Sequence, residues 1–151
     1  MPHSFRGAAL GLFLGLASAL ACAQATPAGL WKTIDDDTKK EKSLVRIVEN
    51  GGVYTGKVDK LLDPATPADA VCKSCSDDRK DKPIAGMTII RGVKAKAGDP
   101  GVYDGGEILD PNNGKVYKVR LMPTDNGTKL EVRGYVGMPM LGRTQTWQRV
   151  E

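Results

Sequence analysis

The strongest constraint on the fold is a series of short segments after residue 28 in which apolar and polar residues alternate. Turn-forming runs separate the segments, and Asn50-Gly51-Gly52 and Asp125-Asn126-Gly127 are strong hairpin signals. The clearest alternation runs from Lys115 to Leu121. No segment shows a convincing period of 3.6 residues. The pattern therefore predicts an antiparallel meander of β-strands rather than alternating strands and helices.

About eight strands are predicted, at a spacing of roughly 10–12 residues. They are expected at residues 29–35, 43–49, 53–62, 87–94, 102–109, 115–121, 128–136 and 142–150. The first strand contains Trp31, and the last contains Trp147 and Arg149. We expect these two ends to lie side by side and close the sheet into a barrel, which removes its exposed edges. The interior of an eight-stranded barrel is filled by side chains or holds one small ligand.

Residues 1–25 have the features of a secretory signal peptide. The apolar run from Ala8 to Ala21 has the length of a signal-peptide core and is too short to span a bilayer comfortably. Small residues follow it, and we expect cleavage after Ala25, with cleavage after Ala23 as the close alternative. Residues 26–151 are then one domain, periplasmic or secreted, with no later segment of transmembrane length.

A lipoprotein is the alternative to simple cleavage. It would need Cys22 as the first mature residue. The usual lipoprotein signal has Leu three positions before this Cys, and that position is Ala19 here. Lipid attachment at Cys22 therefore fits the sequence less well than cleavage near Ala25.

Composition excludes several chemistries from the mature chain. The single histidine is His3, in the signal peptide, so no imidazole remains for acid–base catalysis or metal binding. The net charge of the whole chain is +4, and Arg6 also leaves with the signal peptide. Basic residues are spread among acidic ones without an arginine stripe, so nucleic-acid binding is not expected. We predict no catalytic residues, no cofactor and no metal site.

Residues 63–83 interrupt the strand pattern and are expected to form one long loop, with at most a turn of helix. Loops of this length usually have a function or cover something. In an exported protein, Cys72 and Cys75 favour a disulfide, which would stabilise the fold by only about 2 kcal/mol because the closed loop is short. The alternatives are a thiol–disulfide exchange site, or a metal site that includes Asp77 or Asp78.

Both phenylalanines, Phe5 and Phe13, lie in the signal peptide, so every aromatic residue of the mature chain is Tyr or Trp. This composition is either chance or the lining of a cavity with hydrogen-bonding aromatic side chains. The candidate ligand-binding residues are polar or aromatic residues of the later strands together with one earlier tyrosine: Tyr54, Glu107, Tyr117, Arg133 and Arg143.

The charged candidates each have a structural alternative. Glu107 has the strand parity of Tyr103 and Leu109 and is expected either to point inward or to be an ordinary exposed strand residue. Arg133 and Arg143 would either bind a carboxylate or phosphate through their planar fork of donors, or stack on an aromatic ring and close the barrel. Stacking is the reading we favour.

Residues Met138–Leu141 form an apolar loop between glycines. Buried, this loop would plug one mouth of the barrel, which is the reading we favour. Exposed, it would contact a partner or the cell envelope.

Four ordered motifs resemble a bacterial exported family, the domain-of-unknown-function family 2147. They are Gly29-x-Trp31, the run Gly105–Tyr117, the run Leu130–Gly137 and the run Gly142–Arg149. The resemblance covers essentially the whole mature chain. It implies a lipocalin-like β-barrel without an established activity, so no catalytic residue is transferred.

Lipocalins also pair an early Gly-x-Trp with a late Arg that packs on the indole. Trp31 and Arg149 are similar in order, although Arg143 is an alternative for the arginine. The chain lacks the clear C-terminal helix of true lipocalins.

Three functions are compatible with these observations. The first is a non-enzymatic module that binds a small amphipathic or apolar ligand inside the barrel. The second is a structural or envelope-interaction protein with a filled barrel. The third, a redox enzyme, depends on Cys72 and Cys75 alone.

Overall fold

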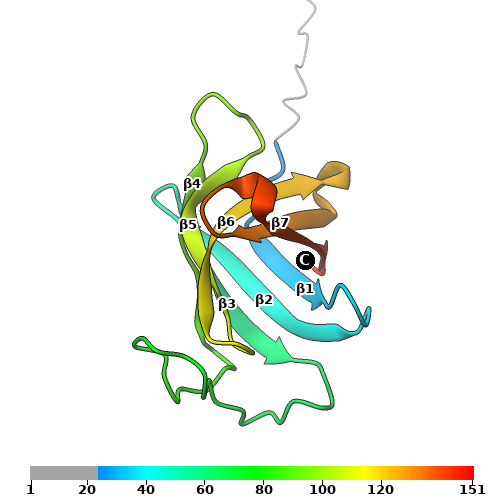
Figure 1. Cartoon of the computed structure of the whole chain (residues 1–151). Coiled ribbons are helices and arrows are strands. Elements are labelled where there is room, and N and C mark those ends of the chain that lie inside the picture. The colour runs from blue at the N-terminus through cyan, green and yellow to red at the C-terminus, as the bar shows by residue number, and fades with distance from the viewer. Residues whose placement is uncertain (1–23) are drawn as a thin grey trace, which may run out of the picture.

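Eight antiparallel strands follow one another around a closed barrel in the computed structural model, which describes residues 24–151 (Figure 1). The strands are β1 (Gly29–Ile34), β2 (Glu41–Asn50), β3 (Val53–Leu61), β4 (Thr88–Ala95), β5 (Tyr103–Asp110), β6 (Lys115–Thr124), β7 (Lys129–Tyr135) and β8 (Arg143–Arg149). Two short 3₁₀ helices, η1 (Asp125–Gly127) and η2 (Pro139–Leu141), lie between β6 and β7 and between β7 and β8. The predicted meander of about eight strands closed into a barrel is confirmed. The predicted signal peptide comprises residues 1–25. Residues 1–23 lie outside the described part of the chain, so the structure describes only residues 24 and 25 of it.

The first and last strands meet as expected. Trp31 lies opposite Arg149, and Lys32 lies opposite Gln148. Backbone hydrogen bonds extend this contact, because the Leu30 N–H donates to the Glu151 carbonyl at 2.8 Å. The β1–β8 pairing does not continue to the other end of the strands, where β8 pairs with β7 alone. The barrel is therefore closed by a short seam that is continuous at one end only.

Alternation places one face of each strand in the core. The fully buried side chains with the largest volumes come from six of the eight strands: Trp31, Ile47, Ile90, Leu109, Leu121 and Leu130, with Val45, Val93 and Val119 beside them. The register of β5 on β6 shifts between Tyr103 and Gly106. Gly105 and Gly106 lie at this point, and glycines often mark such a β-bulge. Burial of this apolar surface is the main force that favours the closed sheet.

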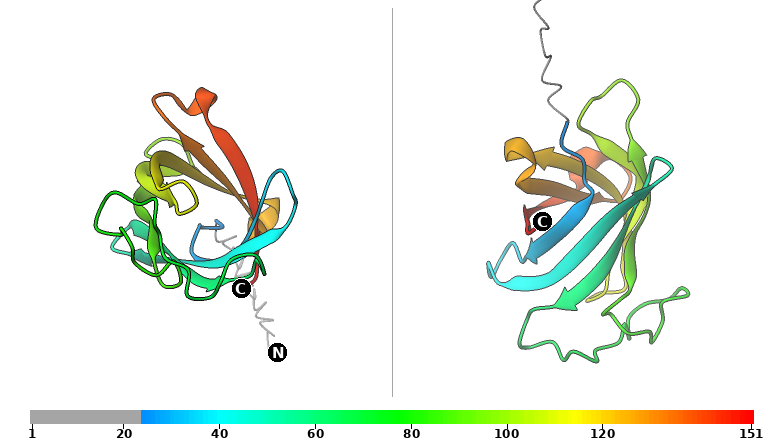
Figure 2. Two further views of the ribbon diagram at one scale, coloured as in Figure 1. Left: turned by 60° about the horizontal axis from the view of Figure 1, so that its bottom comes forward. Right: turned by 180° about the vertical axis from the view of Figure 1, so that it is seen from behind.

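The up-and-down topology gathers the connections at two ends. The β1–β2, β3–β4, β5–β6 and β7–β8 connections lie at one end, which we call the open end. The N-terminal segment and the other three connections lie at the opposite, closed end. Figure 2 (left) shows the strands around the barrel axis, with the long β3–β4 connection (green) at the near end.

That connection, residues 62–87, contains no helix but is held by specific contacts. Cys72 and Cys75 form a disulfide, as predicted, and both residues are buried against the core. The Cys72 N–H donates to the Lys82 carbonyl, and Val71 forms a bridge with Pro83. The buried Arg79 side chain donates to the Thr88 carbonyl at 3.0 Å, which fastens the loop to the start of β4.

The β7–β8 connection differs from expectation. Val136 belongs to the predicted strand at residues 128–136, but it lies beyond the end of β7 and is 71% exposed. The expected plug at Met138–Leu141 is also wrong. Met140 and Leu141 are 72% and 75% exposed, because η2 extends away from the interior as a short turn between two paired strands.

Candidate functional site

The open end of the barrel leads into a cavity of about 390 Å³. This volume lies near the lower end of the range of small-molecule sites, roughly 300–1,000 Å³. Its wall is about half apolar and half polar; the apolar lining residues are Ile34, Val58, Leu61, Ile84, Ile89, Ile108, Leu109, Pro111, Val132 and Trp147. The barrel is therefore not filled completely by its own side chains.

The closed end is sealed by the N-terminal segment. The Trp31 indole N–H donates to the Pro27 carbonyl at 2.7 Å, and the Arg149 guanidinium lies over the Trp31 ring at 4.1 Å. Arg149 also donates to the carbonyls of Ala28 and Thr26 at 2.8 and 3.0 Å. Burial lowers the pKa of this guanidinium, and the three carbonyl and ring partners compensate its lost hydration. These contacts leave the open end as the route into the cavity.

Tyr54 belongs to this filled half of the barrel. Its ring packs edge-to-face on that of Tyr103, with centroids 5.1 Å apart. Burial, and then the contact with Tyr54, raises the pKa of Tyr103. Because the two rings fill the interior at the closed end, Tyr54 does not line the cavity.

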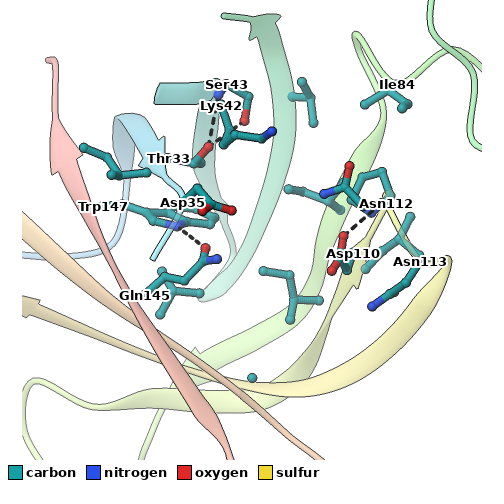
Figure 3. Close-up of a pocket in the computed structure, with 18 of the residues that line it drawn as sticks. Thr33, Asp35, Lys42, Ser43, Ile84, Asp110, Asn112, Asn113, Gln145 and Trp147 are labelled. Atoms are coloured by element: carbon teal, nitrogen blue, oxygen red, sulfur yellow. Dashed lines mark hydrogen bonds between the residues drawn. The ribbon is translucent and has the colours of Figure 1, made fainter. Parts of the chain in front are cut away.

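Six of the cavity residues form three hydrogen-bonded pairs. Thr33 and Ser43 share a hydrogen bond of 2.9 Å between their hydroxyls, and the Trp147 indole donates to the Gln145 amide oxygen at 3.2 Å (Figure 3). Across the cavity, the Asn113 amide donates to the Tyr117 hydroxyl at 3.1 Å. Figure 3 shows Gln145, Trp147, Thr33 and Ser43 on one wall and Asp110, Asn112 and Asn113 on the facing wall.

The charged residues at the rim have partners within the protein. Lys42 forms an ion pair with Asp63, and this hydrogen bond holds the pKa of Asp63 below its usual value. Asp35 accepts hydrogen bonds from the backbone and hydroxyl of Thr38, which likewise lower its pKa. Asp110 accepts from the Asn112 N–H at 2.9 Å.

Arg143 spans the part of the β1–β8 seam that lacks strand pairing. Its guanidinium contacts Asp36 at 2.6 Å and Asp37 at 3.0 Å in the β1–β2 turn. These two carboxylates raise the pKa of Arg143. The ion pairs therefore link β8 to the turn after β1 at the cavity mouth, where no ladder hydrogen bonds do so.

The structure brings only two of the five predicted ligand-binding residues to the cavity. Tyr117 and Arg143 line it, whereas Tyr54, Glu107 and Arg133 do not. Glu107 is half-buried on the sheet opposite Arg91 of β4 and Lys118 of β6, where the opposite charges stabilise it.

Arg133 holds the β7–β8 connection instead of a ligand. Its guanidinium donates to the carbonyls of Pro139 and Met140 and to the Thr144 hydroxyl. Neither Arg133 nor Arg143 stacks on an indole, which is the role of Arg149. Trp147 is buried and forms a wall of the cavity, and it pairs with Leu130 of β7 rather than with β1.

Sequence reasoning missed Gln145 and Asn113. A usable signal was present for Gln145, because residues two apart on a strand share a face and the large apolar ring of Trp147 favours the interior. Asn113 stands in the Asp110–Gly114 turn, whose composition indicated only a chain reversal. Turn residues reach a site only when the fold brings the hairpin over the cavity.

One solved structure resembles the whole barrel. It is protein HP1028 from the human pathogen Helicobacter pylori, described as belonging to the lipocalin family. The two share 22% sequence identity, with a TM-score of 0.71 and coverage of 85% of each chain. This likeness shows a lipocalin-like fold. No curated protein matches the chain, and among residues 24–151 no helix has the length and apolar character needed to cross a bilayer.

The family evidence covers the same region as the barrel. The family described as "Uncharacterized protein conserved in bacteria (DUF2147)" matches residues 29–149, from the first residue of β1 to the last residue of β8. The chain belongs to this family of bacterial proteins of unknown function, and its fold is a lipocalin-like β-barrel.

Proposed function

We propose that this protein is an exported, non-enzymatic module that binds a small amphipathic ligand in its barrel. The observation that carries the proposal is the cavity of about 390 Å³ at the open end, whose wall is partly apolar and partly polar, as an amphipathic ligand requires. Sites of this composition bind small molecules through apolar contact and use their polar groups to orient the ligand. The lipocalin-like fold supports the same reading.

Export is supported by two independent features. The N-terminal residues have the composition of a signal peptide, and the Cys72–Cys75 disulfide is typical of oxidising compartments such as the periplasm. Cleavage after Ala25 would leave Thr26 as the first residue. The Thr26 carbonyl accepts a hydrogen bond from Arg149, so the closed end of the barrel would keep this contact.

Native mass spectrometry of the protein purified from the periplasm of its own host tests the proposal. We expect a bound small molecule that is released on denaturation. The Val132→Phe variant fills part of the cavity and should lose this mass, because Val132 is a buried wall residue. Val48→Phe is the matched control, since Val48 is 42% exposed and does not line the cavity. A wild-type protein without bound mass, or equal retention in both variants, would contradict ligand binding in the barrel.

Contact with the cell envelope is the second candidate function. The exposed side chains of Met138, Met140 and Leu141 favour it, because neighbouring exposed apolar residues often mark contact surfaces. Replacing Met140 and Leu141 by Gln should abolish such contact without changing the mass bound in the cavity. A redox function is less well supported, because both cysteines are buried and reactive cysteines are usually accessible.

A further inference from the structure

We infer that the cavity selects uncharged ligands that carry hydrogen-bond acceptors, such as carbonyl or ether oxygens, and that Gln145 and Tyr117 are the donors that recognise them. This inference rests on the proposed ligand-binding function and specifies the chemical class of the ligand. It follows from which hydrogen-bonding atoms around the cavity are already used within the protein.

The orientation of Gln145 is fixed by its neighbour. The Trp147 indole N–H can only donate, so the side-chain atom of Gln145 that lies 3.2 Å from it must be the amide oxygen. The amide nitrogen is then the other polar end of a half-buried side chain that lines the cavity. From its position on β8, this amide nitrogen can donate its two N–H groups to a ligand in the cavity.

A similar chain of donors fixes Tyr117 on the facing wall. The Lys115 backbone N–H can only donate, and it donates to the Asn113 side-chain oxygen at 2.8 Å. The Asn113 amide nitrogen therefore donates to the Tyr117 hydroxyl at 3.1 Å. Because this hydroxyl already accepts a hydrogen bond from Asn113, its own O–H is available. From β6, it can donate to a ligand in the cavity.

Several other hydrogen-bonding and charged groups around the cavity already have partners within the protein, and the carboxylates of Asp35 and Asp110 accept hydrogen bonds from Thr38 and from the Asn112 N–H. Thr33 and Ser43 bond to each other. Lys42 is paired with Asp63, and Arg143 is paired with two carboxylates of the β1–β2 turn. An anionic ligand would have to compete with these ion pairs, and a cationic ligand would have to compete with the hydrogen bonds that Asp35 and Asp110 accept, whereas an uncharged acceptor requires none of them to break.

Three probes with one aromatic skeleton separate the possibilities. They are 2-acetylnaphthalene, which offers a carbonyl acceptor, 2-methylnaphthalene, which offers no polar atom, and 2-naphthylmethanamine, which offers a cationic donor. Isothermal titration calorimetry should show that the ketone binds wild-type protein roughly three- to tenfold more tightly than the hydrocarbon, the effect of one net hydrogen bond. The amine should bind more weakly than the ketone.

Two variants remove the donors with little change of shape. Gln145→Glu keeps an acceptor for the Trp147 indole but loses both N–H groups, and Tyr117→Phe loses the hydroxyl. We expect each to weaken ketone binding roughly three- to tenfold and to leave 2-methylnaphthalene unchanged. Gln145→Glu should also strengthen binding of the amine. The matched controls are Gln148→Glu, at an exposed position of β8, and Tyr135→Phe, neither of which lines the cavity.

The outcomes separate this inference from the proposed function. Equal binding of ketone and hydrocarbon, or unchanged ketone affinity in both donor variants, overturns the inference and leaves ligand binding intact. A preference of wild-type protein for the amine overturns it as well. Failure of all three probes to bind the wild type contradicts the proposed function. Tyr117→Phe keeps the test decisive if Gln145→Glu does not fold.

Discussion

The guanidinium carbon of Arg149 lies 4.1 Å from the ring centroid of Trp31, so the last strand is fastened to the face of a residue in the first. The same guanidinium reaches Thr26, Ala28 and Gly127 through hydrogen bonds to their carbonyls. One side chain thus joins the N-terminal segment, β1, η1 and β8. The closed end of the barrel depends on this contact more than on the short β1–β8 ladder.

Arg149→Ala should therefore destabilise the barrel strongly. Loss of the ring contact and of three partly buried hydrogen bonds is expected to cost about 2–4 kcal/mol in the free energy of unfolding, measured by urea denaturation. Arg149→Lys should recover only part of this, because an ammonium lacks the planar fork. The control is Arg46→Ala, which removes an exposed ion pair with Glu151 and should cost much less than Arg149→Ala. Equal costs for the two alanine variants would show that Arg149 does not close the barrel.

Trp31→Ala tests how much the buried indole contributes to the stability of the closed end of the barrel. The Trp31 side chain is fully buried, so its truncation should cost about 3–5 kcal/mol in the free energy of unfolding. Trp31→Phe retains much of the apolar contact but leaves the Pro27 carbonyl without its indole donor, and an intermediate cost is expected. A loss below about 1 kcal/mol for Trp31→Ala would mean that the indole is not part of the core.

Gly114→Ala should separate the disulfide loop from the β5–β6 hairpin. Gly114 has a φ of +71°, and a Cβ there would lie 1.9 Å from the Ser74 carbonyl oxygen, within the Cys72–Cys75 loop. We expect faster reduction of the disulfide by dithiothreitol and a loss of about 1–3 kcal/mol in stability. Gly98→Ala is the control, since its φ of +76° carries a similar backbone cost in open space. The same reduction rate in both variants would exclude packing of the loop on this turn.

The long loop should also give the protein a specific acid sensitivity. Hydrogen bonds from Arg79 lower the pKa of Asp77 from 3.8 to about 2. Because the pKa in the folded state is below that of the unfolded chain, the interaction stabilises the fold above about pH 4 and is lost as the pH falls toward about 2. The contribution is at most about 1 kcal/mol, since the Asp77 side chain is 37% exposed.

Thermal unfolding between pH 2 and pH 6 measures this effect. Asp77→Asn should lower the Tm at pH 6 and flatten the decline of the Tm in the acid range. In an Arg79→Lys background, which weakens the shared interaction, the Asp77→Asn change should have a smaller effect. Parallel pH profiles for wild type and Asp77→Asn would exclude the Asp77–Arg79 pair as a source of acid sensitivity.

The alternation of residues was sufficient to predict the strands and the meeting of Trp31 with the last strand, because both follow from short-range periodicity and hairpin turns. The cavity was harder to predict. Tyr54 and Glu107 were chosen for their chemistry, but an aromatic partner and cross-strand charges, which sequence alone does not reveal, place them elsewhere. Gln145 follows from the parity of Trp147, whereas Asn113 and the loop contacts at Gly114 depend on tertiary packing.

The location of a bound probe tests the central claim most directly. With isotope-labelled protein and unlabelled 2-acetylnaphthalene, intermolecular nuclear Overhauser effects should connect the probe to Ile89, Val132 and Trp147 in the cavity wall. Contacts only with the exposed Met138, Met140 and Leu141 side chains would show that the ligand binds outside the barrel and would contradict the account.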